Sequence, residues 1–264
     1  MLPPFLYVVI AAGLIVPIHV RAVEPSVPST IVKFVAPKPT KDPLEFSLAH
    51  IEVSGEITND AAARLKAALE VASLKTNART LGGYPAVYVY LDSPGGNVQA
   101  ALKMGSLLRA SGAQAWVRPN KLCASACILV LAGGVKRFAF DGARLGIHRP
   151  FFEQSLFAGM QLSEAQQKYK ALSESVRAYL SGMGVSDRLY NQMMNIPSHA
   201  VVFLTEHEAS EMNLLGEDPA FSEWDRARAS EKYRPEFLDW NDCLLSGTSQ
   251  EKCAAILKAA RSKN

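Results

Sequence analysis

The chain has 264 residues, enough for one α/β domain with a large buried core. Its formal net charge of only +3 argues against nucleic-acid binding. Hydrophobic residues make up 48% and charged residues 20% of the chain, as is ordinary for a globular protein.

The first 22 residues have the pattern of a targeting segment. Residues 5–16 form an uncharged apolar run, shorter than the roughly 20 residues that span a bilayer. A small-residue cleavage site follows at Ala22, although no Lys or Arg precedes the apolar run. We expect a cleaved secretory signal and a periplasmic protein. The alternative is an uncleaved anchor in the inner membrane.

The next segment, residues 23–47, contains five prolines and predicts an extended linker or a surface-hugging arm. From residue 48 to 219, strands alternate with helices. Strands are expected near 50–53, 86–91, 114–117, 137–140, 144–147 and 201–204, and helices near 59–71, 98–110, 124–131, 162–180 and 187–194. Such alternation predicts an α/β domain with a largely parallel sheet and flanking helices. Residues 220–264 are expected to form an appended helical tail.

The four cysteines form two pairs. Cys243 and Cys253 lie in the tail and are candidates for a disulfide between two short helices. Cys123 and Cys127 are four residues apart, so we expect them to share one helix face as buried thiols. No second Cys/His pair has suitable spacing, so we expect no metal site.

Ser125 is expected at the start of the apolar helix near 124–131. The first amides of a helix have no partner within it and favour negative charge, so a hydroxyl there suits acyl transfer. The alternative is an ordinary capping serine, because Ser is a preferred N-cap.

Two further elements are candidates to form a catalytic site together with this serine. Gly95 and Gly96 follow the strongest predicted strand, and such a turn either exposes amides to a ligand or only joins a strand to a helix. His148 ends an apolar strand, where crevices of open α/β sheets form. A lone histidine there is often structural, but it is also the base that a serine nucleophile needs.

Taken together, the ordered motifs resemble the ClpP endopeptidase family of the crotonase-like superfamily, and exported bacterial ClpP-like proteins in particular. The motifs are Gly55-Glu56-Ile57, Leu91-Asp92-Ser93-Pro94-Gly95-Gly96, Ala124-Ser125-Ala126, Ala143-Arg144-Leu145-Gly146-Ile147-His148-Arg149-Pro150 and Phe203-Leu204-Thr205-Glu206-His207-Glu208-Ala209. The resemblance covers residues 48–216 and implies repeated ββα units. It also implies Ser125 as nucleophile, His148 as general base, and the amides of Gly96 and Ala126 as oxyanion hole.

One expected residue is missing. The family places an Asp shortly before the Phe-Leu-Thr element, but residues 195–202 contain no carboxylate. Asn195, Ser198 and His199 are the candidates for orienting His148. Without an orienting group, the rate of a triad enzyme falls by orders of magnitude.

Three functions follow as hypotheses. The first is an exported serine endopeptidase that forms an acyl-enzyme on Ser125. The second is a catalytically impaired domain that binds peptides or scaffolds an assembly. An acyl-CoA enzyme is the third, and export argues against it.

The resemblance also bears on partners. It implies a peptide or protein substrate and a homo-oligomer, with no cofactor and no nucleic acid. A membrane is expected as a partner only if the N-terminal segment stays uncleaved. The helical stripe from Leu162 to Leu180 serves either oligomer contact or internal packing.

Overall fold

The computed structural model describes residues 30–36 and 49–261, except for 77, 81, 153, 198, 232, 234 and 247. The predicted signal at 1–22 lies outside the described residues, as does most of the predicted linker. No helix within the described ranges is both long and apolar enough to cross a bilayer.

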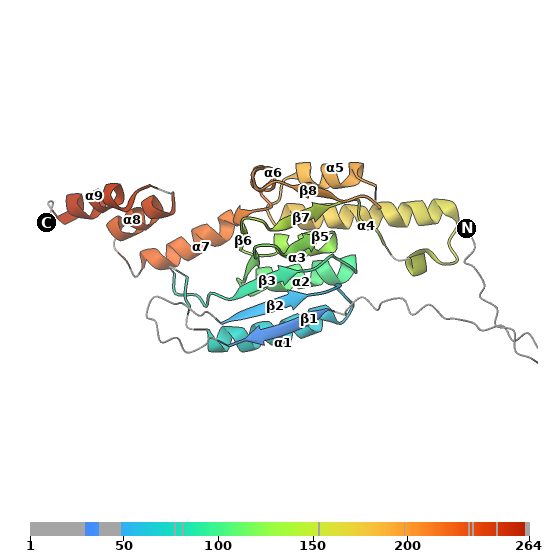
Figure 1. Ribbon diagram of the computed structural model, residues 1–264, viewed down its shortest axis with the longest axis horizontal. Helices are drawn as coiled ribbons and strands as arrows, with labels where there is room; N and C mark the ends of the chain where they lie inside the picture. Colours follow the sequence, from blue (N-terminus) through green and yellow to red (C-terminus); the bar gives the residue numbers. More distant parts are fainter. Residues whose placement is uncertain are drawn as a thin grey trace, which may run out of the picture.

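The main sheet is parallel at its centre and antiparallel at both edges (Figure 1). Its strands, in spatial order, are β1 (Ile31–Val35), β2 (His50–Ser54), β3 (Tyr88–Asp92), β4 (Gln114–Val117), β6 (Lys136–Ala139) and β9 (Gly216–Glu217). A smaller sheet has the order β5 (Leu122–Ala124), β7 (Arg144–Ile147) and β8 (Val202–Leu204). The α/β fold with a mostly parallel sheet is therefore confirmed.

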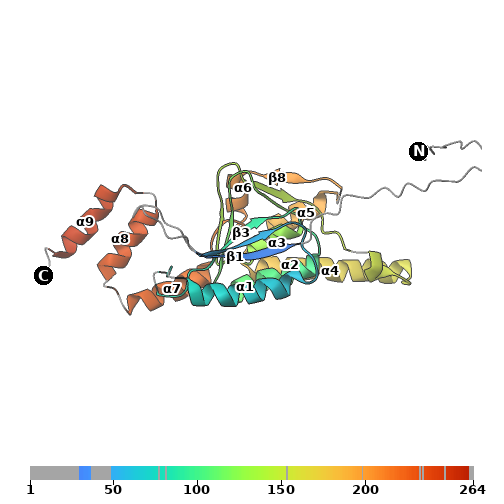
Figure 2. The same cartoon turned by 60° about the horizontal axis from the view of Figure 1, so that its bottom comes forward.

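Helices flank the main sheet, and Figure 2 shows α1, α2 and α4 along the same side of it. The helices are α1 (Ala61–Lys75), α2 (Val98–Ala110), α3 (Ala126–Ala132), α4 (Leu162–Gly182), α5 (Asp187–Asn195), α6 (Glu206–Glu211), α7 (Pro219–Ser230), α8 (Pro235–Leu245) and α9 (Gln250–Arg261), with a 3-10 turn at Gln154–Phe157. Period-2 burial on the strands explains this layering. On β2 and β3, Ile51, Val53, Val89 and Leu91 are buried in one core with the apolar faces of α1 and α2.

Two local predictions change in detail. Residues 31–35, expected within an extended linker or surface-hugging arm, form the edge strand β1 on β2, where Val32 and Phe34 pack against the core and Val32 pairs with Val53. The apolar helix begins at Ala126, later than expected, because residues 122–124 form the short strand β5.

The tail is helical, with α8 and α9 extending away from the sheets (Figure 1). Cys243 and Cys253 form a disulfide that joins these two helices, as the sequence had suggested. The predicted stripe on α4 divides: Val176 and Leu180 are buried in the core, whereas Leu162 is 75% exposed.

Candidate active site

Ser125, His148 and Gly96 line one cavity of about 400 Å³. The structure thus brings together three residues that lie far apart in the sequence. The cavity wall also includes Glu56 and Asn97 on its polar part, and the apolar side chains Phe151, Phe152 and Leu156.

Ser125 occupies a sharp turn between β5 and α3. Its φ of 56° and ψ of −125° lie where residues with a Cβ atom are seldom found. Its N–H donates to Gly146 O at 2.9 Å, which ties the turn to β7. Its Oγ makes no capping hydrogen bond to α3, so the capping role considered from the sequence is not observed. Ser125 is half-buried and lines the cavity.

The glycine turn packs directly on the serine turn. Gly95 has a φ of +109°, and a Cβ atom added to it would lie 2.6 Å from Ser125 Cβ and 3.0 Å from Ala126 N. Only glycine permits this approach. Gly96 has a φ of +137°, and a Cβ atom there would lie 2.4 Å from Ile57 O.

Backbone pairing holds the two turns in register. Ser93 N–H donates to Leu122 O at 2.7 Å, and Ala124 N–H donates to Ser93 O at 3.0 Å. The buried Ser93 hydroxyl also accepts the Gly95 N–H at 3.1 Å. The end of β3 is therefore an extra partner of β5, and this pairing sets the position of the glycines relative to Ser125.

The oxyanion-hole candidates have available amides. Ala126 is the first residue of α3, so its N–H has no acceptor within the helix. Within the described ranges, neither the Ala126 nor the Gly96 N–H donates a hydrogen bond. Two such amides beside a nucleophile are suited to hold a developing oxyanion.

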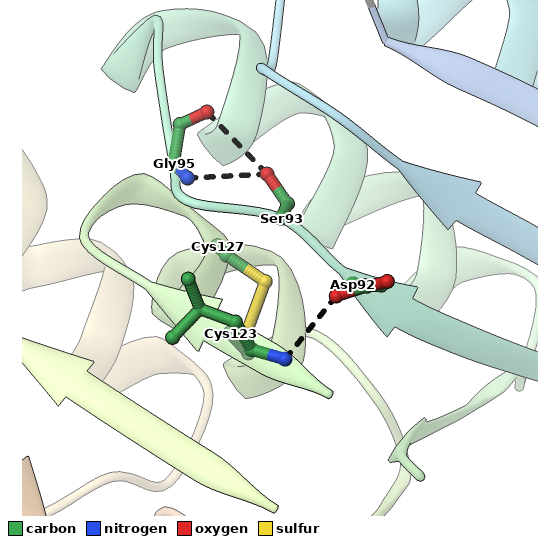
Figure 3. The surroundings of a disulfide bond; sticks show 6 residues. Asp92, Ser93, Gly95, Cys123 and Cys127 are labelled. Carbon is green, nitrogen blue, oxygen red and sulfur yellow. Dashed lines mark hydrogen bonds between the residues drawn. A yellow bond between two sulfur atoms is a disulfide. The ribbon is translucent and has the colours of Figure 1, made fainter. Parts of the chain in front are cut away.

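Cys123 and Cys127 form a disulfide, so the prediction of free thiols is wrong (Figure 3). Their Cα atoms are 5.2 Å apart. The prediction failed because Cys123 lies on β5 and only Cys127 lies on α3, so the pair spans a strand-to-helix turn instead of one helix face. Both side chains are buried. The disulfide also removes the two thiolates that half a metal site would require.

His148 follows β7 and is half-buried. Its Nδ1 lies 2.8 Å from Arg149 O. With its proton on Nδ1 the ring donates this bond, and Nε2 remains as the atom that accepts a proton. Among the described residues, no hydrogen bond joins Ser125 Oγ to His148; such bonds often form only when substrate binds.

Two of the three orienting candidates can be placed in the structure, and neither is hydrogen-bonded to His148 among the described residues. Asn195 and His199 are exposed and make no hydrogen bond to it in the described part of the chain, and Ser198 lies outside that part. The observed partner is a main-chain carbonyl, that of Arg149, which sequence reasoning missed because a backbone acceptor has no residue signature.

Arg149 is itself firmly held. Its N–H donates to Ile196 O at 3.1 Å, and its Nε and Nη2 donate to Met194 O at 2.9 and 2.6 Å. Both acceptors are carbonyls at the C-terminal end of α5, which an arginine satisfies well. The segment after His148 is thus fixed to α5.

Comparison with known families agrees with this geometry. The family model described as Clp protease matches residues 46–210, more than half of the chain. The chain belongs to the Clp protease family. Among curated proteins, none matches the chain. The Clp protease match spans Gly96, Ser125 and His148, and identifies the domain as ClpP-like peptidase. The carboxylate that this family places before the Phe-Leu-Thr element remains absent here.

Proposed function

We propose that the chain is an exported serine endopeptidase that cleaves peptide bonds through an acyl-enzyme on Ser125. The observation that carries the proposal is the turn of Ser125, which has a positive φ and no capping hydrogen bond and lines the same cavity as His148 and Gly96. An ordinary capping serine has no need of either feature.

The steps follow from the named atoms. His148 Nε2 accepts the proton as Ser125 Oγ attacks the peptide carbonyl, and the amides of Gly96 and Ala126 hold the oxyanion. His148 then gives the proton to the leaving amine as the C–N bond breaks. Water, deprotonated by His148, hydrolyses the ester and restores Ser125. The Arg149 carbonyl takes the orienting place of the missing carboxylate and lacks its charge, so turnover is slow.

Labelling with a fluorophosphonate probe tests this mechanism. Wild type is expected to label, and Ser125→Ala and His148→Ala are expected not to. Two matched controls are available: Ser106 is an exposed serine on α2, and His207 is an exposed histidine on α6. Ser106→Ala and His207→Ala should label like wild type, and equal labelling of Ser125→Ala would exclude the mechanism.

A non-catalytic peptide-binding or scaffold domain is the second candidate. The missing carboxylate and the neutral partner of His148 favour it. This function predicts peptide binding without turnover, unchanged by Ser125→Ala. Cleavage that depends on Ser125 would exclude it.

Export and assembly are part of the proposal. The apolar run at residues 5–16 and the two disulfides support an oxidising compartment. ClpP-like proteins commonly form oligomers, and we place the proposed contact between copies on α4, where Leu162 is exposed. Fractionation of the host cell and light scattering of wild type beside Leu162→Glu test these two points.

A further inference from the structure

The disulfide Cys123–Cys127 joins the two residues that lie at equal distances before and after Ser125 in the sequence. Each cysteine is two residues from Ser125, one on β5 and the other in the first turn of α3. Figure 3 shows the bridge beside Ser93 and Gly95, which belong to the segment that leads into the glycine turn. The bridge therefore crosses the same strand-to-helix junction that gives Ser125 its unusual backbone.

This junction is held unequally on its two sides. On the strand side, hydrogen bonds from Ala124 N–H to Ser93 O and from Ser125 N–H to Gly146 O fix the backbone at 3.0 and 2.9 Å. On the helix side, the Ile128 N–H bond to Ser125 O is local and would survive small rotations of the turn. Core packing and the hydrogen bond from the Tyr179 hydroxyl to Leu129 O hold the body of α3, and the disulfide is the covalent link between its first turn and β5.

A relaxed form of the turn is easy to specify. Ser125 would adopt an extended backbone with negative φ, and its Oγ would accept an amide of the first turn of α3, as most N-cap serines do. A hydroxyl bound in this way is turned from the cavity. Such relaxation moves the first turn of α3 relative to β5, and the Cys123–Cys127 bond opposes that movement.

We propose that the Cys123–Cys127 disulfide is a positioning element that holds Ser125 in its reactive conformation. Measuring this role by the reactivity of Ser125 rests on the proposed peptidase function. Measuring it by the backbone conformation of Ser125 does not. The pair is a poor choice for general stabilisation, because the entropy that a disulfide removes from the unfolded chain grows with the length of the closed loop. Its sequence separation is 4, against 10 for Cys243–Cys253.

The second disulfide provides a matched control. The variants to compare are Cys123→Val/Cys127→Ala, in which valine preserves buried volume, and Cys243→Ala/Cys253→Ala, which removes the remote disulfide. We expect the first variant to be labelled by the fluorophosphonate at least tenfold more slowly than wild type, and the second at the wild-type rate. In peptide hydrolysis, kcat should fall and KM should stay the same, because the cavity wall is intact.

Crystal structures make the test independent of activity. The expected result is a positive Ser125 φ in wild type. In the Cys123→Val/Cys127→Ala variant, we expect a negative φ and an Oγ that caps α3. A folded variant that keeps the positive φ and labels like wild type would overturn the proposal. If wild type never labels, the peptidase function fails, and the change of Ser125 conformation still decides the positioning role.

A reversible experiment covers a variant that does not fold. Wild-type protein unfolded and refolded in excess dithiothreitol should recover its secondary structure but label slowly, and reoxidation should restore the rate. If alkylation shows that Cys123 and Cys127 are reduced in the refolded protein and this protein still labels rapidly, the proposal is overturned as well.

Discussion

Gly95 lies so close to Ser125 that an added Cβ atom would stand 2.6 Å from the Ser125 Cβ. Any movement of the glycine turn relative to the turn of Ser125 therefore changes the positions of the oxyanion-hole amides relative to each other. We expect Gly95→Ala to abolish labelling of Ser125 and to lower the free energy of unfolding by about 1–3 kcal/mol. Labelling rate and urea unfolding measure these effects.

Gly83 provides the control for this substitution. It also has a positive φ, +84°, but an added Cβ atom meets nothing within 4 Å. Gly83→Ala should cost a similar backbone strain and leave labelling unchanged. A Gly95→Ala protein that reacts at the wild-type rate would show that the contact does not position Ser125.

Arg149 is expected to act through His148. Its carbonyl accepts the hydrogen bond from His148 Nδ1, and its guanidinium donates two hydrogen bonds to Met194 O. Arg149→Ala should lower kcat by about 10-fold and alter the pH profile of the reaction, since the imidazole loses its fixed orientation. Arg149→Lys should not rescue the rate, because an ammonium cannot reproduce the two-pronged contact.

The control for Arg149 is Arg188, an exposed arginine on α5. Among the described residues, its guanidinium forms only a 3.8 Å ion pair with Glu211. Arg188→Ala should leave kcat and the pH profile unchanged. An Arg149→Ala protein with the same profile as this control would contradict the positioning role.

Glu56 is the only acid among the described residues that line the cavity, and none of them is Lys or Arg. Its Cγ lies 3.0 Å from the position of a Cβ atom on Gly96, so its side chain flanks the oxyanion-hole candidate. We expect peptides with lysine beside the cleaved bond to be preferred over those with norleucine. Glu56→Gln should reduce that preference by about 5-fold, as for a partly solvated ion pair. An unchanged kcat/KM ratio for the two peptides would refute the role of Glu56.

Asp218 stabilises the fold away from the cavity. It is buried, forms an ion pair with Arg109, and accepts the Phe221 N–H at 2.9 Å. Burial acts to raise the pKa of Asp218, but the Phe221 hydrogen bond and the nearby Arg109 and Arg137 outweigh it and hold the pKa below its ordinary value. We expect Asp218→Asn to lower the free energy of unfolding by about 3 kcal/mol at neutral pH, because two guanidiniums lose their counter-ion.

The sign of the pH dependence follows from this lowered pKa. The ionised Asp218 contributes its full stability above the unfolded pKa, and the contribution is lost as the pH falls through the lower folded pKa. The difference between wild type and Asp218→Asn should therefore be constant above about pH 5 and shrink toward about pH 3. Urea unfolding across that range checks it, and a difference that grows in acid would contradict this assignment.

The sequence predicted those features that depend on pattern and order. Parallel strands with crossover helices bring Gly96, Ser125 and His148 to one cavity. It did not predict the bond between Cys123 and Cys127, because the bond depends on where β5 ends and α3 begins. The Arg149 carbonyl was missed for a related reason, since backbone acceptors are placed by tertiary packing.

Peptide mapping after fluorophosphonate treatment tests the central claim most directly. The oxidised protein is treated, digested and analysed by tandem mass spectrometry. We predict a single phosphonyl adduct on Ser125, absent when His148 is replaced by alanine. A folded protein with no adduct on Ser125, or with the same adduct level in His148→Ala, would contradict a Ser125–His148 peptidase and leave the peptide-binding function in its place.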